Sequence, residues 1–138
     1  MSGFPAAFNT TRDEQPAYGQ PGTASIPPGH GVVVARLPSG PSSPDNAFGV
    51  APAAPGDAPH AVASHRNTQP LSDKLLGRIT LLSSPLFVVR METAGKQDDV
   101  IGITTADGKW GTGATLGAAR LVEDVAAGEL AWATRIGI

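Results

Sequence analysis

The chain has 138 residues, of which 41% are hydrophobic and 16% are charged, with a formal net charge of -2 and no cysteine. This is the length of one domain. The absence of cysteine excludes disulfides, thiolate nucleophiles and cysteine-based zinc sites. The charges are scattered without a lysine or arginine run, which argues against nucleic-acid binding. No apolar run reaches the roughly 18–20 residues of a membrane span, so no membrane contact is expected.

Proline divides the sequence into two parts. Thirty residues are glycine or proline, and 11 of the 13 prolines lie within the first 60 residues. Because proline fixes φ and removes a backbone donor, residues 1–28 are predicted to form an extended N-terminal arm. Residues 29–138 are predicted to form a β-sandwich domain of the jelly-roll type, interrupted by an irregular loop at 38–59.

Short apolar runs begin after the arm. Three consecutive valines between glycine and proline predict a strand at 32–37 that is apolar on both faces. Further short strands are expected at 47–51 and 60–64. A single helical turn is expected at 72–76, followed by a strand at 78–83.

The second half shows clearer alternation. In residues 86–92, Phe87, Val89 and Met91 fall on one face, which predicts a strand with one buried side. The polar run at 94–99 is predicted to turn the chain into a partner strand at 100–105, so that the two form a hairpin. The last strands are expected at 118–124 and 129–136.

The whole pattern predicts an all-β fold. Seven to nine short strands at intervals of about 8–15 residues, without a long helix, are typical of a β-sandwich or barrel, and the long connections favour a jelly-roll-like arrangement. No internal repeat is visible in the sequence. The predicted core comprises Val33, Phe87, Val89, Ile101, Ile103, Leu121, Leu130 and Trp132.

No group of residues indicates a catalytic, cofactor or metal site. The glycines at 111, 113 and 117 lack the lysine and hydroxyl residue that end a phosphate-binding loop. His30, His60 and His65 lie in proline-rich surroundings without metal-ligand spacing. Asp98 and Asp99 are adjacent, so they point to opposite sides of an extended chain and fit a polar turn. We therefore expect a protein that is not an enzyme and that has no cofactor.

The N-terminal third favours a role in an assembly. Its residues would each lose about 1–2 kcal/mol on ordering, with little apolar burial to offset that loss. A partner surface that accepts an added strand or an aromatic anchor would supply the missing burial. The predicted partner-binding residues are Phe4, Phe8, Arg12 and Tyr18 in the arm and Arg135, Ile136 and Ile138 at the C-terminus.

Three features resemble bacteriophage head cement (decoration) proteins, in particular the jelly-roll type from short-tailed phages. They are the opening MSGFPAAFNTT, the proline- and glycine-rich first third and the closing VAAGELAWATRIGI. The resemblance implies a virion protein on the capsid exterior, assembled in the host cytoplasm. It also implies contact with the major capsid protein, bridging of its subunits to stabilise the shell, and a homodimer or homotrimer. No residue role is carried over from the family.

Other interpretations stay open. A tail or baseplate β-domain has a similar composition. A small ligand- or carbohydrate-binding β-sandwich would need a cluster of exposed aromatic residues, yet the chain has only seven aromatic residues. A hydrolase with a site assembled from scattered histidines and aspartates has the least support.

Overall fold

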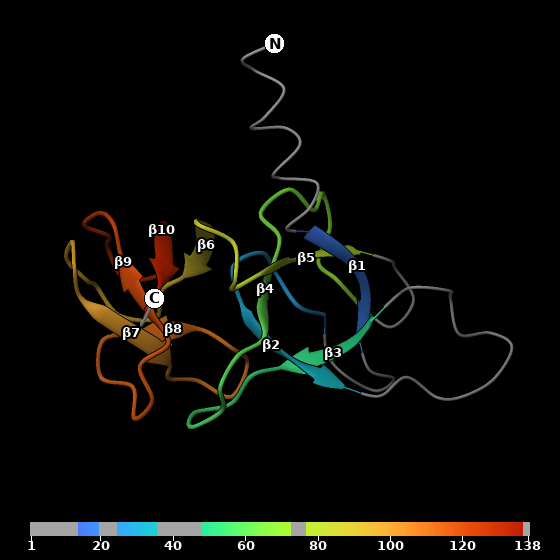
Figure 1. Cartoon of the computed structure of the whole chain (residues 1–138), viewed down its shortest axis with the longest axis horizontal. Helices are drawn as coiled ribbons and strands as arrows, with labels where there is room; N and C mark the ends of the chain where they lie inside the picture. Colours follow the sequence, from blue (N-terminus) through green and yellow to red (C-terminus); the bar gives the residue numbers. More distant parts are fainter. Residues whose placement is uncertain (1–13, 20–24, 36–47, 73–76, 137–138) are drawn as a thin grey trace, which may run out of the picture.

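The computed structural model describes residues 14–19, 25–35, 48–72 and 77–136 (Figure 1). These residues form ten β-strands and no helix, which confirms the predicted all-β fold. No helix that could cross a membrane occurs in this part of the chain. The strands form two sheets that lie side by side (Figure 1).

The first sheet is a closed barrel, which is one of the two all-β arrangements that the strand spacing predicts. Its strands are β1 (Glu14–Gly19), β2 (Gly31–Ala35), β3 (Phe48–Pro52), β4 (Ala61–Ala63) and β5 (Gly77–Leu81), in the order β1-β3-β2-β4-β5. All neighbours are antiparallel except β1 and β3, which are parallel and close the ring. Its interior is apolar and consists of Ala17, Ile26, Val32, Val50, Ala61, Ala63, Leu71 and Ile79.

Strand β1 lies within the range expected as an N-terminal arm. It pairs with both β3 and β5, and Ala17 is fully buried. Pro16 is exposed and precedes the three residues that pair with β3. Ile26 is also buried and bridges Leu71. Residues 14–19 and 26 therefore belong to the barrel, and residues 1–13 lie outside the described part of the chain.

The second sheet is curled and is formed by the second half of the sequence, in which apolar and polar residues alternate more clearly. Its strands are β6 (Phe87–Arg90), β7 (Val100–Ile103), β8 (Trp110–Gly111), β9 (Ala119–Leu121) and β10 (Leu130–Arg135), in the order β6-β10-β9-β7-β8. The predicted hairpin of β6 and β7 is wrong, because β6 pairs with β10 and β7 pairs with β8 and β9. After β6 the chain bridges a distant loop instead: Gly95 and Val125 exchange two backbone hydrogen bonds of 2.9 and 3.0 Å.

The two sheets repeat one topology. In the first, β5 pairs with β1 and β4, β4 pairs with β2, and β2 pairs with β3. In the second, β10 pairs with β6 and β9, β9 pairs with β7, and β7 pairs with β8. The parallel pairing that closes the barrel, Gly19 with Val50, corresponds to an isolated parallel bridge of Met91 with Trp110. The chain thus contains two copies of a five-stranded unit, which we call the first unit (14–82) and the second unit (86–136).

The repeat extends to the hydrogen bonds of one turn. In the first unit, Gly29 N donates to Ala63 O, and Ala63 N donates to His30 O, both at 2.9 Å. In the second unit, Asp98 N donates to Leu121 O, and Leu121 N donates to Asp99 O, again at 2.9 Å. The bridge of Ile26 with Leu71 likewise corresponds to that of Gly95 with Val125. These matches at equivalent positions support a structural duplication that the sequence does not show.

The first unit covers the open side of the second. The second core contains Phe87, Met91, Ile101, Ile103, Trp110 and Leu121, and it also includes Ala53, Val62 and Leu82 from the first unit. Gly31 N donates to Gly108 O at 2.8 Å, and Arg90 N donates to Gly29 O at 3.0 Å. A Cβ on Gly31 would lie 2.6 Å from Cδ1 of Ile103. The two units therefore share a core.

The faces of β10 are opposite to the prediction. Ala131 and Ala133 are buried, at 3% and 0% exposure, whereas Leu130 and Trp132 are 39% and 41% exposed. Trp110 and Phe87, with ring centroids 6.4 Å apart, fill the second core and leave room only for small side chains on the inner face of β10. Leu130 and Trp132 are therefore wrong core predictions. Of the other predicted core residues Val33 is partly buried, and Phe87, Val89, Ile101, Ile103 and Leu121 are buried as expected.

Candidate interaction surface

Exposed apolar side chains are concentrated on the second unit. Among the described residues, seven large hydrophobic side chains are exposed, and only Val34 belongs to the first unit. The other six are Leu86, Val100, Leu116, Val122, Leu130 and Trp132. Single exposed apolar residues are common on soluble proteins, but a contiguous group indicates an interaction surface.

Strand pairing places four of these six side chains, Val100, Val122, Leu130 and Trp132, on one face of the sheet. Residues directly opposite each other in antiparallel strands share a face, and Trp132 lies opposite Val88 while Arg120 lies opposite both Thr134 and Val100. Val122 N donates to Trp132 O at 3.2 Å, which brings Val122 beside β10. We call these side chains, which point away from the second core, the outer face: Val88, which is only 7% exposed, and Val100, Arg120, Val122, Leu130, Trp132 and Thr134.

The β8–β9 connection extends the outer face. The carbonyl of Leu116 lies against Gly102 and leaves no space there for a Cβ. Next to it, a Cβ on Gly117 would lie 2.6 Å from Cγ1 of Val100 and 3.7 Å from Cδ1 of Ile136. Ile136, one of the predicted partner-binding residues, is therefore close to Val100 on this side of the sheet.

The equivalent surface of the first unit is already covered. By the strand correspondence, Val62 on β4 occupies the position of Arg120 on β9. Val62 is 1% exposed because it packs into the second core. No described segment covers Arg120, Val122 or Trp132 in the same way, since all three are exposed. The second unit thus presents the surface that the first unit uses for packing.

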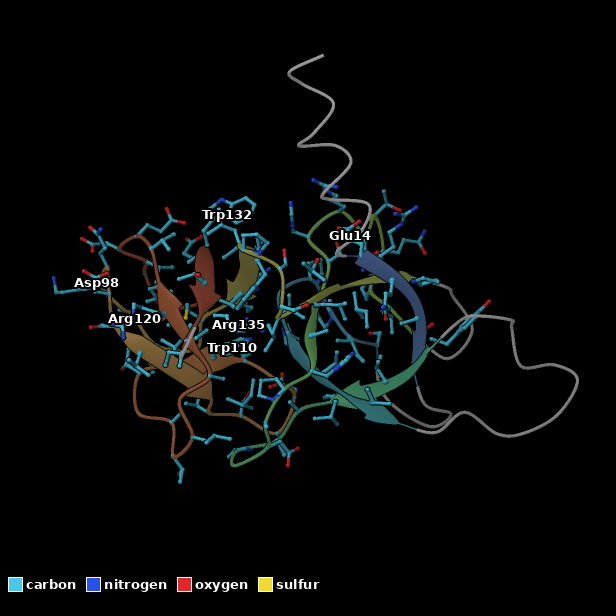
Figure 2. All side chains as sticks on the ribbon, viewed as in Figure 1. Glu14, Asp98, Trp110, Arg120, Trp132 and Arg135 are labelled. Atoms are coloured by element: carbon cyan, nitrogen blue, oxygen red, sulfur yellow. The ribbon has the colours of Figure 1, made fainter. Side chains whose placement is uncertain are left out.

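A polar cluster adjoins the outer face where the two units meet. The rings of His65 and Trp132 are in edge contact, with centroids 5.4 Å apart. The Glu14 side chain is only 3% exposed; it accepts a hydrogen bond of 2.8 Å from Ser64 Oγ and lies 3.5 Å from Arg78 Nη1 and 3.9 Å from Arg66 Nη1. We call Glu14, His65, Arg66, Arg78 and Trp132 the junction cluster. Trp132 and Glu14 lie on the same, upper side of the molecule in Figure 2.

The members of the junction cluster differ in charge and in exposure. Burial and the neighbouring Arg66 guanidinium lower the pKa of His65 below 6.5, although Glu14 opposes the shift. His65 is therefore neutral at neutral pH. The two arginine side chains are 50% and 61% exposed, so positive charge reaches the surface while the balancing carboxylate stays buried.

The structure separates the predicted partner-binding residues. Phe4, Phe8, Arg12 and Ile138 lie outside the described residues. Tyr18 is half-buried in β1, inside the range that pairs with β3. Arg135 is exposed at the end of β10 and pairs with Ala119 of β9. Since β10 lies between β6 and β9, its backbone is used on both sides, and the surface it offers is made of side chains.

Trp132, Leu130 and Val122 were not predicted as surface residues. The available signal was Ala131 and Ala133, because two alanines alternating with larger side chains are expected where a strand faces a crowded interior. Glu14, Arg66 and Arg78 carried no sequence signal, since they are 12 to 64 residues apart and meet only through β1, β5 and the β4–β5 connection.

The residues considered for chemistry have structural contacts. His30 is 4% exposed, with Nδ1 2.7 Å from Asp107 O. Asp99 Oδ2 accepts from Lys96 N at 2.9 Å within the expected polar turn. No group of three or more histidine, aspartate or glutamate side chains suited to a metal ion occurs among the described residues.

No protein-family model matches the chain, and no curated protein has a matching sequence. Among solved structures, the chain is similar to the head fiber gp8.5 N base in bacteriophage phi29, with a TM-score of 0.62. The two chains share a fold. The similarity covers 91% of this chain and 98% of that chain, at 13% sequence identity. It therefore includes both units and identifies a protein of the same architecture.

Proposed function

We propose that this chain is a structural, non-enzymatic protein of a phage virion that attaches to the head. The observation that carries the proposal is the fold similarity to a protein described as a head fiber base, which extends over nearly the whole of both chains. The outer face adds a physical reason, because an apolar surface on one unit is suited to attachment from one side.

The more specific proposal is a cement role on the capsid exterior. The outer face would contact the major capsid protein, and residues 1–13 with Phe4, Phe8 and Arg12 would form an arm on a neighbouring subunit. A homodimer or homotrimer would join several modest contacts, which act together at high effective concentration. Such a protein would be added in the host cytoplasm and would stabilise the shell by bridging its subunits.

A fiber base is a second candidate within the same class. It is favoured by the description of the similar structure as the base of a head fiber. The two roles differ in a measurable property: a cement raises the resistance of heads to heat or osmotic shock, whereas a base attaches without that effect.

Attachment can be tested by co-sedimentation with purified phage heads that lack this chain. We expect binding of the wild-type chain, and we expect Val122→Asp to weaken it about tenfold or more, because it places a charge in an apolar contact. Ala58→Asp is the matched control, since it adds the same charge at an exposed position between β3 and β4 of the first unit.

Electron microscopy of decorated particles completes the test. Density on the tail or baseplate, or no binding to heads, would contradict the proposal. Binding of the free chain to a glycan array in place of heads would favour the carbohydrate-binding alternative.

A further inference from the structure

The junction cluster brings together side chains from both units that suit a partner contact. Trp132 comes from β10 of the second unit, and Arg66 and Arg78 come from the β4–β5 connection and β5 of the first. His65 joins them through its contact with the Trp132 ring. Tryptophan and arginine are the residue types that dominate binding energy in protein interfaces, and here they adjoin the apolar outer face.

The two guanidinium groups retain unused donor capacity. Their contacts with Glu14 measure 3.5 and 3.9 Å, longer than the roughly 2.7–2.9 Å of a well-formed charge-assisted hydrogen bond. Each guanidinium carries several N–H donors, and one buried carboxylate with a further bond to Ser64 cannot occupy them all. The exposed side of the pair therefore favours a second acceptor of negative charge.

We propose that the junction cluster docks a segment of a head protein that presents carboxylate side chains next to an apolar side chain. The inference rests on the proposed function, because it names the chemistry of the partner in head attachment. The carboxylates accept hydrogen bonds from Arg66 and Arg78, and the apolar side chain packs on the exposed ring of Trp132. Leu130 extends this apolar contact toward Gly29, because a Cβ on Gly29 would lie 2.7 Å from Cδ2 of Leu130.

An acidic protein segment fits the cluster better than a nucleic acid does. Binding along a phosphate backbone depends on neutralising several phosphates with lysine and arginine side chains. The cluster offers two guanidinium groups and a neutral histidine, in a chain with a formal net charge of -2. Two guanidinium groups beside one aromatic ring match a pair of carboxylates in a short peptide segment.

The test compares variants that disturb the same ion pair with opposite effects on charge. Arg66→Gln with Arg78→Gln removes the surface cations, whereas Glu14→Gln removes the buried anion and leaves the cluster more positive. Trp132→Ala tests the apolar contact. Lys109→Gln, at a side chain that is 41% exposed, is the matched control for loss of one positive charge. Each full-length variant is first checked for folding by circular dichroism, and its affinity for heads lacking this chain is then measured at about 50 and 300 mM salt.

The variants are expected to change the affinity for heads in different directions. Relative to wild type, the double arginine variant and Trp132→Ala bind heads about tenfold or more weakly, and the arginine variant loses most of the salt dependence. Glu14→Gln binds about threefold more tightly at low salt, and Lys109→Gln stays within about twofold of wild type. If the ion pair only supported the fold, Glu14→Gln and the arginine variant would both weaken binding.

Two failures can be told apart. If wild-type protein does not bind heads, the proposed function is overturned together with this inference. If wild-type protein binds and the arginine variant binds equally well at both salt concentrations, the docking inference alone is overturned. Displacement of wild-type protein from heads by a single-stranded DNA oligonucleotide, but not by a glutamate-rich peptide, would also overturn it, because the cluster would then recognise phosphate.

Discussion

Asp98 occupies a turn position at which the fold elsewhere uses glycine. It has φ of 73°, while Gly29, in the equivalent turn of the first unit, and Gly128, in the turn before β10, have φ of 86° and 82°. Aspartate tolerates this left-handed conformation better than most residues, but glycine adopts it without a steric penalty. Arg120 Nη1 donates a hydrogen bond of 3.1 Å to the backbone oxygen of Asp98. This bond does not depend on the Asp98 side chain.

We expect Asp98→Gly to raise the free energy of unfolding by roughly 0.5–1 kcal/mol and Asp98→Val to lower it by about 1–2 kcal/mol. Gly128→Asp is the matched reverse change and should lower it. Urea denaturation followed by circular dichroism measures all three. A stabilising effect of Asp98→Val would show that the positive φ is not maintained in solution.

Protonation of the His65 side chain lowers the stability of the folded state. Since burial and Arg66 hold the pKa of the folded state below the ordinary value of 6.5, the unfolded chain binds this proton more readily. The contribution of His65 to stability is therefore fully present above pH 6.5 and decreases as the pH falls below that value. It is modest because the side chain is largely exposed to solvent.

The measurement is the free energy of unfolding of wild type and His65→Asn at about pH 7.5 and pH 5. Wild type should lose more stability than the variant between these values. An equal loss in both proteins would assign the pH dependence to other groups.

Strand β10 shows what alternation in a sequence does and does not determine. The spacing of Leu130, Trp132 and Thr134 correctly assigns these residues to one face of a strand, but it cannot say which face is buried. That choice depends on Trp110 and Phe87, which are distant in sequence and fill the second core. The positions of β2, β6 and β7 could be predicted from local pattern, whereas the partner of β6 could not, because pairing with β10 is set by the whole sheet.

The two tryptophans should differ in their contribution to stability. Trp110 is fully buried, and Trp132 is 41% exposed. We expect Trp110→Ala to lower the free energy of unfolding by about 3–5 kcal/mol, and Trp132→Ala to lower it by less than half as much. Chemical denaturation followed by far-ultraviolet circular dichroism tests this. Equal losses would mean that the outer face is covered in solution, for instance by a second copy of the chain.

At the scale of the whole molecule, the all-β class could be predicted from the sequence, but the duplication could not. Equivalent positions keep apolar character but not residue type: Val50 corresponds to Trp110, Ala17 to Val89 and Ala63 to Leu121. The larger indole of Trp110 fills space beside a short β8, where the first unit has a full strand, β3. All three exchanges put a larger side chain in the second unit, and no sequence repeat remains.

The shared core predicts that the two units unfold together. Val62 and Leu82 of the first unit are part of the second core, so loss of either unit exposes apolar surface of the other. Tryptophan fluorescence reports the second unit and its contacts with the first, because both tryptophans lie in the second unit, whereas circular dichroism reports the strands of both. We expect the two denaturation curves to coincide. Separate midpoints would show that the units are independent.

The closed barrel of β1 to β5 affects how closely copies of the chain can be placed without aggregating. Where many copies stand close together, as on a particle surface, an unpaired strand edge is a template for chain-to-chain polymerisation. A closed barrel offers no such edge to its neighbours. Half of this molecule can thus be present at high density without aggregating, and specific contacts are left to the side chains of the other half.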